Sequence, residues 1–89
     1  MTEDELQQTL TCLENQTRRL VFTRLCRSEI PMTPTLMAAS LGLKVGTVSH
    51  HLVWLEDMGL CIRLKSGTNN LYGVDREKIK ALVKWLNTL

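Results

Sequence analysis

The stretch PTLMAASLGLKVGTVSHHLVWLEDMGL, residues 34–60, predicts two helices joined by a short turn. Pro34 is tolerated at the first position of a helix, and Gly42 can end that helix in a left-handed conformation. After about four residues, a second helix should run from about Val45 to Met58. This is a helix-turn-helix, whose second helix can enter a DNA major groove. The side chains expected to face inward are Leu36, Met37 and Leu41 on the first helix and Val48, Leu52 and Leu55 on the second.

Two more helices are predicted before this pair. Residues 3–13 have leucines at helical spacing and acidic side chains in the first turn. Asn15 can cap a helix that runs to about Arg27. The residues expected on the inner faces are Leu6, Leu10 and Leu13, followed by Val21, Phe22 and Leu25.

After the pair, the period of the apolar pattern changes from helical to alternating. Residues 60–65 alternate apolar and polar side chains, which predicts a half-buried strand with Leu60, Ile62 and Leu64 inward. A loop at 66–70, a strand at 71–74 and a helix at 76–89 should follow. The predicted fold is therefore mainly α with a small β-hairpin: a single winged helix-turn-helix domain over residues 1–89.

The charge is unevenly distributed along the 89 residues. Residues 1–14 carry four acidic side chains and no Lys or Arg, whereas the rest holds all 11 basic residues against five acidic ones. A basic body of this kind suits a polyanionic partner. Only four residues are aromatic, so a stacking platform for single-stranded nucleic acid is not expected.

Neither a secretory signal nor a membrane span is visible in the sequence. The three cysteines are odd in number and lack the C-x-x-C spacing. A reduced chain in the cytoplasm, with no membrane partner and no cofactor, is the simple expectation.

The second helix of the pair has an outer face suited to DNA. That face is uncharged as far as Glu56, and its small polar side chains allow the backbone to approach base edges. The residues expected to read bases are Val45, Gly46, Thr47, Ser49 and His50. The residues expected to contact the DNA backbone are Thr33, Thr35, Lys44, Arg63, Lys65, Asn69 and Asn70, the last two at the tip of the wing.

Two segments resemble the ArsR/SmtB-type winged-helix repressors. NQTRRLVFTRLC (15–26) looks like their opening helix and LGLKVGTVSHHLVWLEDMGL (41–60) like their recognition unit, within a resemblance that covers residues 15–75. It implies a homodimer that binds double-stranded DNA sequence-specifically, with dimer contacts from residues 1–14 and 76–89. The apolar residues available for those contacts include Leu6, Leu10, Leu82, Val83 and Leu86.

The chain departs from this family at its metal sites. Metal sensors of the family commonly carry paired cysteines in the helix matching residues 34–41, where this chain has none, or ligands on the last helix, which here lacks histidine. His50 and His51 do not replace them, because adjacent helical residues point about 100° apart and a helical chelate needs i, i+3 or i, i+4 spacing. His51 should lie nearer the core, as a packed or phosphate-bonding residue. No metal site and no enzymatic site is expected.

Two alternatives stay open at this stage. Cys26 and Cys61 could approach each other and form a redox pair, because some members of the family sense oxidants through cysteines; the competing interpretation is small buried side chains. The second alternative is a winged helix that binds proteins and has no specific DNA readout.

Overall fold

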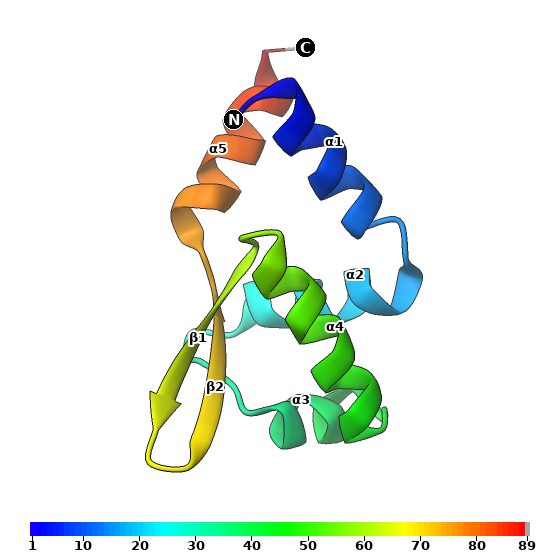
Figure 1. Ribbon diagram of the computed structural model, residues 1–89, viewed down its shortest axis with the longest axis vertical. Helices are drawn as coiled ribbons and strands as arrows, with labels where there is room; N and C mark the ends of the chain where they lie inside the picture. The colour runs from blue at the N-terminus through cyan, green and yellow to red at the C-terminus, as the bar shows by residue number, and fades with distance from the viewer. Residues whose placement is uncertain (89) are drawn as a thin grey trace.

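The computed structural model describes residues 1–88, and it confirms a winged helix-turn-helix that is mainly helical (Figure 1). Seven elements follow one another along the chain, with four helices before a hairpin and one after it. They are α1 (Glu3–Cys12), α2 (Gln16–Arg27), α3 (Pro34–Leu41), α4 (Val45–Asp57), β1 (Cys61–Ser66), β2 (Asn69–Val74) and α5 (Arg76–Asn87). Leu89, the last residue of the predicted final helix, lies outside the described residues.

Side-chain caps explain where four of the helices begin. The side chains of Thr2, Asn15, Thr33 and Asp75 each accept a hydrogen bond from a backbone N–H in the first turn of α1, α2, α3 and α5. Gly42 ends α3 in the left-handed conformation, with φ at 68°. The predicted turn between α3 and α4 is therefore present, with its glycine in the expected place.

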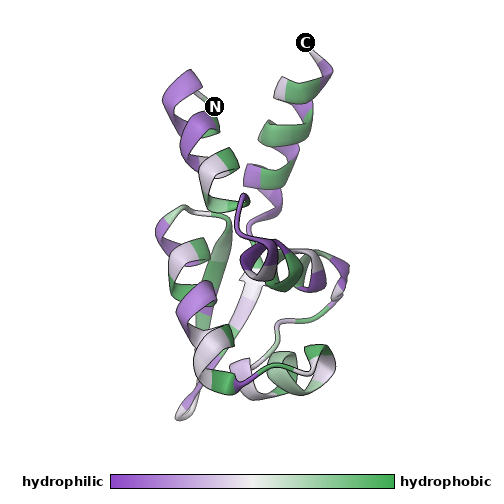
Figure 2. Ribbon diagram, turned by 90° about the vertical axis from the view of Figure 1, so that its right-hand side faces the viewer, coloured by the Kyte–Doolittle hydropathy of each residue, from purple (hydrophilic) through white to green (hydrophobic). Residues whose placement is uncertain are grey.

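The core forms where α2, α3 and α4 pack against one another and against the base of the hairpin. α4 contributes the inner stripe Val48, Leu52 and Leu55, all fully buried, as its spacing predicts. Figure 2 shows the hydrophobic sides of these helices turned toward one another. The other buried side chains include Val21, Phe22, Leu25, Met37, Ala38 and Leu60.

The hairpin is longer and its turn tighter than the sequence pattern indicated. β1 and β2 pair antiparallel from Cys61 with Val74 to Ser66 with Asn69, so a two-residue turn led by Gly67, with φ at 62°, joins them. The predicted loop at 66–70 is wrong, because Asn69 and Asn70 belong to β2 and pair with Ser66 and Lys65 of β1, so that only two residues lie between the strands.

A short tie holds the hairpin to the loop between α2 and α3. Met32 and Tyr72 exchange two backbone hydrogen bonds, with N–O distances of 2.9 and 2.8 Å. Tyr72 and Met32 are both buried, and Tyr72 is the one fully internal side chain of β2. The base of the wing is thus fixed to the helical body.

Four side chains expected inside the protein are exposed instead: Leu10 (48%), Leu36 (51%), Ile62 (45%) and Leu64 (44%). α1 turns Leu6, Thr9 and Cys12 inward, and the eight-residue α3 buries only Met37 and Ala38. On β1 only Cys61 is buried, because the hairpin projects beyond the helices and the face that carries Ile62 and Leu64 is only partly covered, beside the loop at residues 28–31.

The elements separate toward two ends of the molecule (Figure 1). The wing tip, α3 and the N-terminal end of α4 lie at one end, and α1 and α5 at the other. α5 has an apolar face but no buried residue. No helix between residues 1 and 88 is long and apolar enough to cross a membrane.

Substitutions on α3 and α4 should distinguish the core from the exposed leucine. Leu52→Ala, at a fully buried position, should lower the free energy of unfolding by about 2–5 kcal/mol through lost burial and a cavity. Leu36→Ala should lower it by less than about 1 kcal/mol. Urea unfolding followed by circular dichroism measures both. Equal losses would contradict the assignment of Leu36 to the surface.

Candidate nucleic-acid interface

The exposed face of α4 is determined by its buried face. Because successive helical residues are about 100° apart, packing the core stripe turns Val45, Gly46, Thr47 and His50 outward, and these four are exposed. Ser49 is half-buried at the edge of this face. The structure therefore brings the five predicted base-reading residues onto one end and one side of α4.

The first turn of α4 lacks a side-chain cap. Lys44 occupies the capping position, its carbonyl accepts from the Val48 N–H at 3.1 Å, and its side chain makes no capping hydrogen bond. No acidic residue lies in this turn. Free N–H groups, the positive end of the helix dipole and an exposed lysine together make this helix end suitable for an anion such as a phosphate.

The N-terminal end of α3 offers two hydroxyl groups. The Thr33 oxygen accepts from the Leu36 N–H at 3.1 Å, which uses it as a cap but leaves its O–H free to donate. Thr35 is exposed in the first turn. Both predicted backbone contacts therefore lie at the start of the first helix of the helix-turn-helix.

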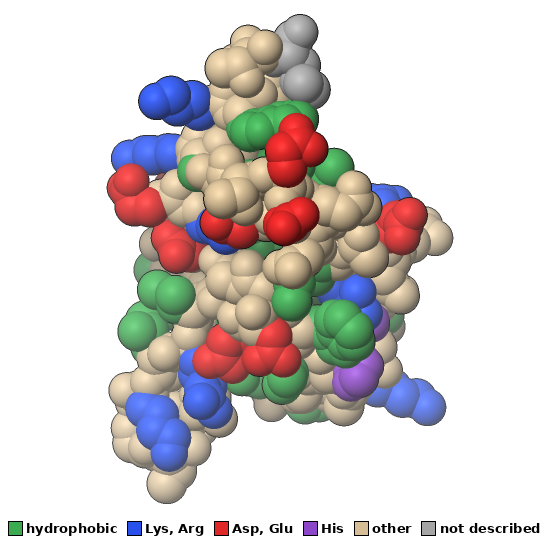
Figure 3. Space-filling view, turned by 45° about the horizontal axis from the view of Figure 1, so that its top comes forward, with side chains coloured by type: hydrophobic (Ala, Val, Ile, Leu, Met, Phe, Trp, Pro, Cys, Tyr) green, Lys and Arg blue, Asp and Glu red, His purple; other side chains and the backbone are tan. Residues whose placement is uncertain are grey.

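The wing carries the remaining predicted phosphate contacts, but not all are equally available. Lys and Arg side chains gather on the wing at the lower left of Figure 3. Arg63 Nε lies 3.3 Å from Glu56 Oε2, so this arginine forms an ion pair with α4. Lys65 and Asn69 are exposed, whereas the Asn70 Oδ1 is buried and has no partner within the described chain.

Glu56 is the residue of this region that the sequence analysis missed. It was noted only as the first charge on α4, and no spacing rule connects a helix residue with a strand residue across a turn. Its carboxylate pairs with Arg63 across the junction of α4 and the wing, in an ion pair that is partly exposed to solvent. The surface charge of the wing toward DNA thus depends more on Lys65 than the sequence suggested.

The two adjacent histidines have different environments. Their ring centroids lie 5.6 Å apart at 61°, with His50 exposed and His51 only 8% exposed. Burial, and secondarily the positive charges of Arg18 and His50, lower the pKa of His51 below its ordinary value. Its Nδ1 is buried and has no hydrogen-bond partner among residues 1–88. His51 is thus a packed residue, the first of its two predicted roles.

The three cysteines are free thiols. Burial raises the pKa of Cys61 to about 12, with Glu56 and then Cys12 adding to the effect, and its thiol donates to the Leu52 carbonyl at 3.6 Å. Cys26 is half-buried, and burial raises its pKa as well. The redox pair of Cys26 and Cys61 stays a prediction, and both thiols are poor nucleophiles.

No group of three or more His, Cys, Asp or Glu side chains converges as a metal site within residues 1–88. The exposed His50 and the buried His51 diverge from one helix, as their spacing requires.

Comparison with protein families gives one match that covers this region. The model of the family described as "Bacterial regulatory protein, arsR family" matches residues 15–62, from the cap of α2 into β1. This is more than half of the chain and includes both helices of the helix-turn-helix. No curated protein matches the chain.

Several solved structures share the fold over nearly the whole chain. An ArsR-like transcriptional regulator from Rhodococcus sp. RHA1 has a TM-score of 0.82 at 21% identity, over 96% of this chain and 78% of that one. The homodimeric winged helix-turn-helix domain Mb0332 from Mycobacterium bovis has 0.74 at 23%, over 96% and 80%. The transcriptional regulator HlyU from Vibrio vulnificus CMCP6 has 0.71 at 26%, over 91% and 82%.

The depressed pKa of His51 predicts a specific pH dependence of stability. The folded state favours the neutral imidazole, so the unfolded chain takes up the proton first as the pH falls below the ordinary value of 6.5. The free energy of unfolding should therefore decrease between about pH 7.5 and pH 5.5. His51→Leu should flatten this dependence, whereas His50→Ala, which removes only the smallest of the three causes, should leave most of it in place. Urea unfolding at each pH measures it, and an unchanged slope in His51→Leu would contradict the prediction.

Proposed function

We propose that this chain, which belongs to the arsR family of bacterial regulatory proteins and is a DNA-binding transcriptional regulator rather than an enzyme, binds an inverted repeat as a homodimer and represses transcription. The observation that carries the proposal is the exposed, uncharged N-terminal half of α4 in the second position of a helix-turn-helix. The remaining arguments concern base readout, phosphate contacts and the dimer.

Base readout is assigned to the outer face of α4. Thr47, Ser49 and His50 have side chains that donate and accept hydrogen bonds, as base edges in the major groove require. Gly46 has no side chain to hold the helix away from the bases, and the position faces open space, because a Cβ added there would meet no atom of the described chain within 4 Å. Val45, which is exposed, has a methyl surface suited to a thymine methyl. An exposed helix face without Lys or Glu is unusual unless something covers it.

Phosphate contacts are assigned to groups that surround this face at the same end of the molecule. Lys44 begins α4, Thr33 and Thr35 begin α3, and Lys65 and Asn69 lie on the wing (Figure 1). Such contacts fix the register of α4 on the duplex and make affinity salt-dependent. Arg63 joins them only if it leaves Glu56, and Asn70 only through the part of its amide that remains exposed.

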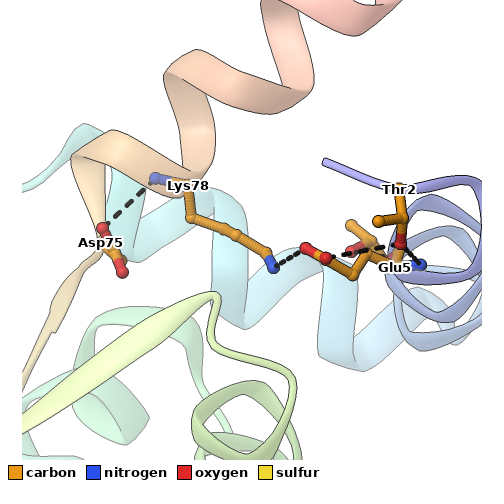
Figure 4. Close-up of polar contacts among 5 residues, drawn as sticks. Thr2, Glu5, Asp75 and Lys78 are labelled. Atoms are coloured by element: carbon orange, nitrogen blue, oxygen red, sulfur yellow. Dashed lines mark hydrogen bonds and ion pairs between the residues drawn. The ribbon is translucent and has the colours of Figure 1, made fainter.

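Dimerisation is assigned to α1 and α5. Val83 and Leu86 are 49% and 47% exposed on a helix that buries none of its residues. Lys78 Nζ joins the two helices through Glu5 Oε2 at 3.3 Å, and this contact lowers the pKa of Glu5 (Figure 4). This ion pair links α1, with its exposed Leu10, to α5, and the Mycobacterium bovis domain of the same fold is homodimeric.

The remaining properties follow from this arrangement. Two α4 helices related by a two-fold axis would enter successive major grooves about 34 Å apart, which requires an inverted repeat. A dimer bound over a promoter would block transcription. We infer a cytoplasmic location, because the DNA target would lie there.

Binding to selected duplexes tests base readout against phosphate contact. After selection of an operator from a random duplex pool, His50→Ala should weaken binding to that operator by about 5- to 150-fold and relax its specificity. Lys65→Ala should weaken binding to all sequences and reduce the slope of log affinity against log salt by about one. Fluorescence anisotropy at several salt concentrations measures both.

Lys80 is the matched control for Lys65. It lies on α5, away from the proposed DNA interface, and its Nζ pairs with Glu77 Oε1 at 3.4 Å. Lys80→Ala should bind like the parent. If the parent shows neither sequence preference nor salt dependence, a winged helix that binds proteins would be the better description.

Light scattering tests the dimer. The double substitution Val83→Glu, Leu86→Glu should convert the protein to a monomer, because it places charges on the apolar face of α5. Leu64→Glu alters a similarly exposed leucine on the wing and should leave the dimer intact. A parent that is monomeric at all concentrations, or a double variant that stays dimeric, would refute this assignment.

A further inference from the structure

A pocket lies on the side of the molecule where α1, α2 and α4 meet. Its volume is about 410 Å³, within the range of small-molecule sites. Its lining includes Gln7, Thr11 and Cys12 of α1, Arg18 at the start of α2, Trp54 of α4, and Met58, the residue that follows α4. Most of this surface is apolar, with one cation and several hydrogen-bonding side chains.

Arg18 is a cation without a counter-ion. Its guanidinium carbon lies 4.4 Å from the centroid of the Trp54 ring, and its Nη1 donates to the Cys12 carbonyl at 3.0 Å. Its Nε is buried and has no partner within the described chain, and no carboxylate there forms a salt bridge with it. Because no carboxylate of the described chain pairs with this guanidinium and Arg18 lines the pocket, an anion that enters the pocket would supply the missing counter-charge.

The pocket does not coincide with the proposed dimer face. Gln7 and Thr11 are hydrogen-bonded to each other at 3.2 Å along one side of α1. Gln7 directly follows Leu6, and Thr11 directly follows Leu10. Both side chains therefore point about 100° away from the stripe that these leucines form on α1. Figure 3 shows basic, hydrophobic and histidine side chains next to one another on the right side of the molecule.

We propose that this pocket binds a small organic anion with a planar apolar body, such as an aromatic carboxylate. The anion pairs with the guanidinium of Arg18, and the apolar body lies against Trp54, Met58 and Cys12. The amide of Gln7 and the hydroxyl of Thr11 supply further hydrogen bonds to its polar edge. Charge complementarity selects the anion, and the aromatic and thioether walls select the body.

The site includes Trp54 in the C-terminal half of α4 and the C-cap residue Met58, so its occupancy acts on the helix proposed to read DNA. His51, on the same helix, lies within the field of Arg18, and neutralising that charge changes the surroundings of the packed imidazole. A ligand effect on DNA affinity rests on the proposed function, whereas ligand binding itself does not.

Calorimetric titration of the full chain with naphthalene-2-carboxylate tests the inference. The carboxylate should bind and quench tryptophan emission, and the neutral naphthalene-2-carboxamide should bind at least about tenfold more weakly. Arg18→Gln should weaken carboxylate binding by a similar factor, and Arg18→Lys, which keeps the charge, should lose less. Circular dichroism checks that each variant is folded.

Arg19→Gln is the matched control. Arg19 is exposed and donates to the neighbouring Leu13 carbonyl at 2.8 Å, but it does not line the pocket. Its substitution should leave the affinity unchanged. Absence of heat and quenching up to about 1 mM carboxylate, or equal affinity for the amide, would overturn the proposal. So would equal losses in the two glutamine variants. None of these results depends on DNA binding.

Discussion

The burial of one stripe of α4 against α2 and α3 is the constraint on which the rest of the structure depends. Val48, Leu52 and Leu55 are completely inaccessible to solvent, and helical geometry then decides which side chains of α4 face outward. The same packing leads the chain through Leu60, also fully buried, into the first strand. The position of the helix and the start of the wing are therefore consequences of one apolar contact.

The sequence predicted most of the fold because its helices carry local signals. Caps at Asn15, Thr33 and Asp75 and the glycine at the end of α3 act within a few residues of one another, and the structure confirms them. The strands were harder. Alternation at residues 60–65 indicated a half-buried strand. Whether one face of a strand is covered depends on elements distant in sequence, however, and here Ile62 and Leu64 remain exposed.

The site shows the same division between local and distant information. The helical period placed the five base-reading residues on α4, and the structure brings them together at one exposed end. Pairing across elements left no trace in the spacing, so the Arg63–Glu56 ion pair and the cation over Trp54 were both missed. The sequence pattern also failed to show that Asn69 and Asn70 pair with β1. These asparagines were assigned to a loop, whereas the turn between the strands has only two residues.

The uncapped start of α4 has a consequence for the energetics of recognition. The other four helices satisfy an N-terminal amide with a side chain of the protein itself, whereas this one leaves its first amides to the solvent. A phosphate group that accepts from those amides would complete the helix in the way a capping residue does. Complex formation would then supply from the DNA the cap that the chain does not provide for this helix.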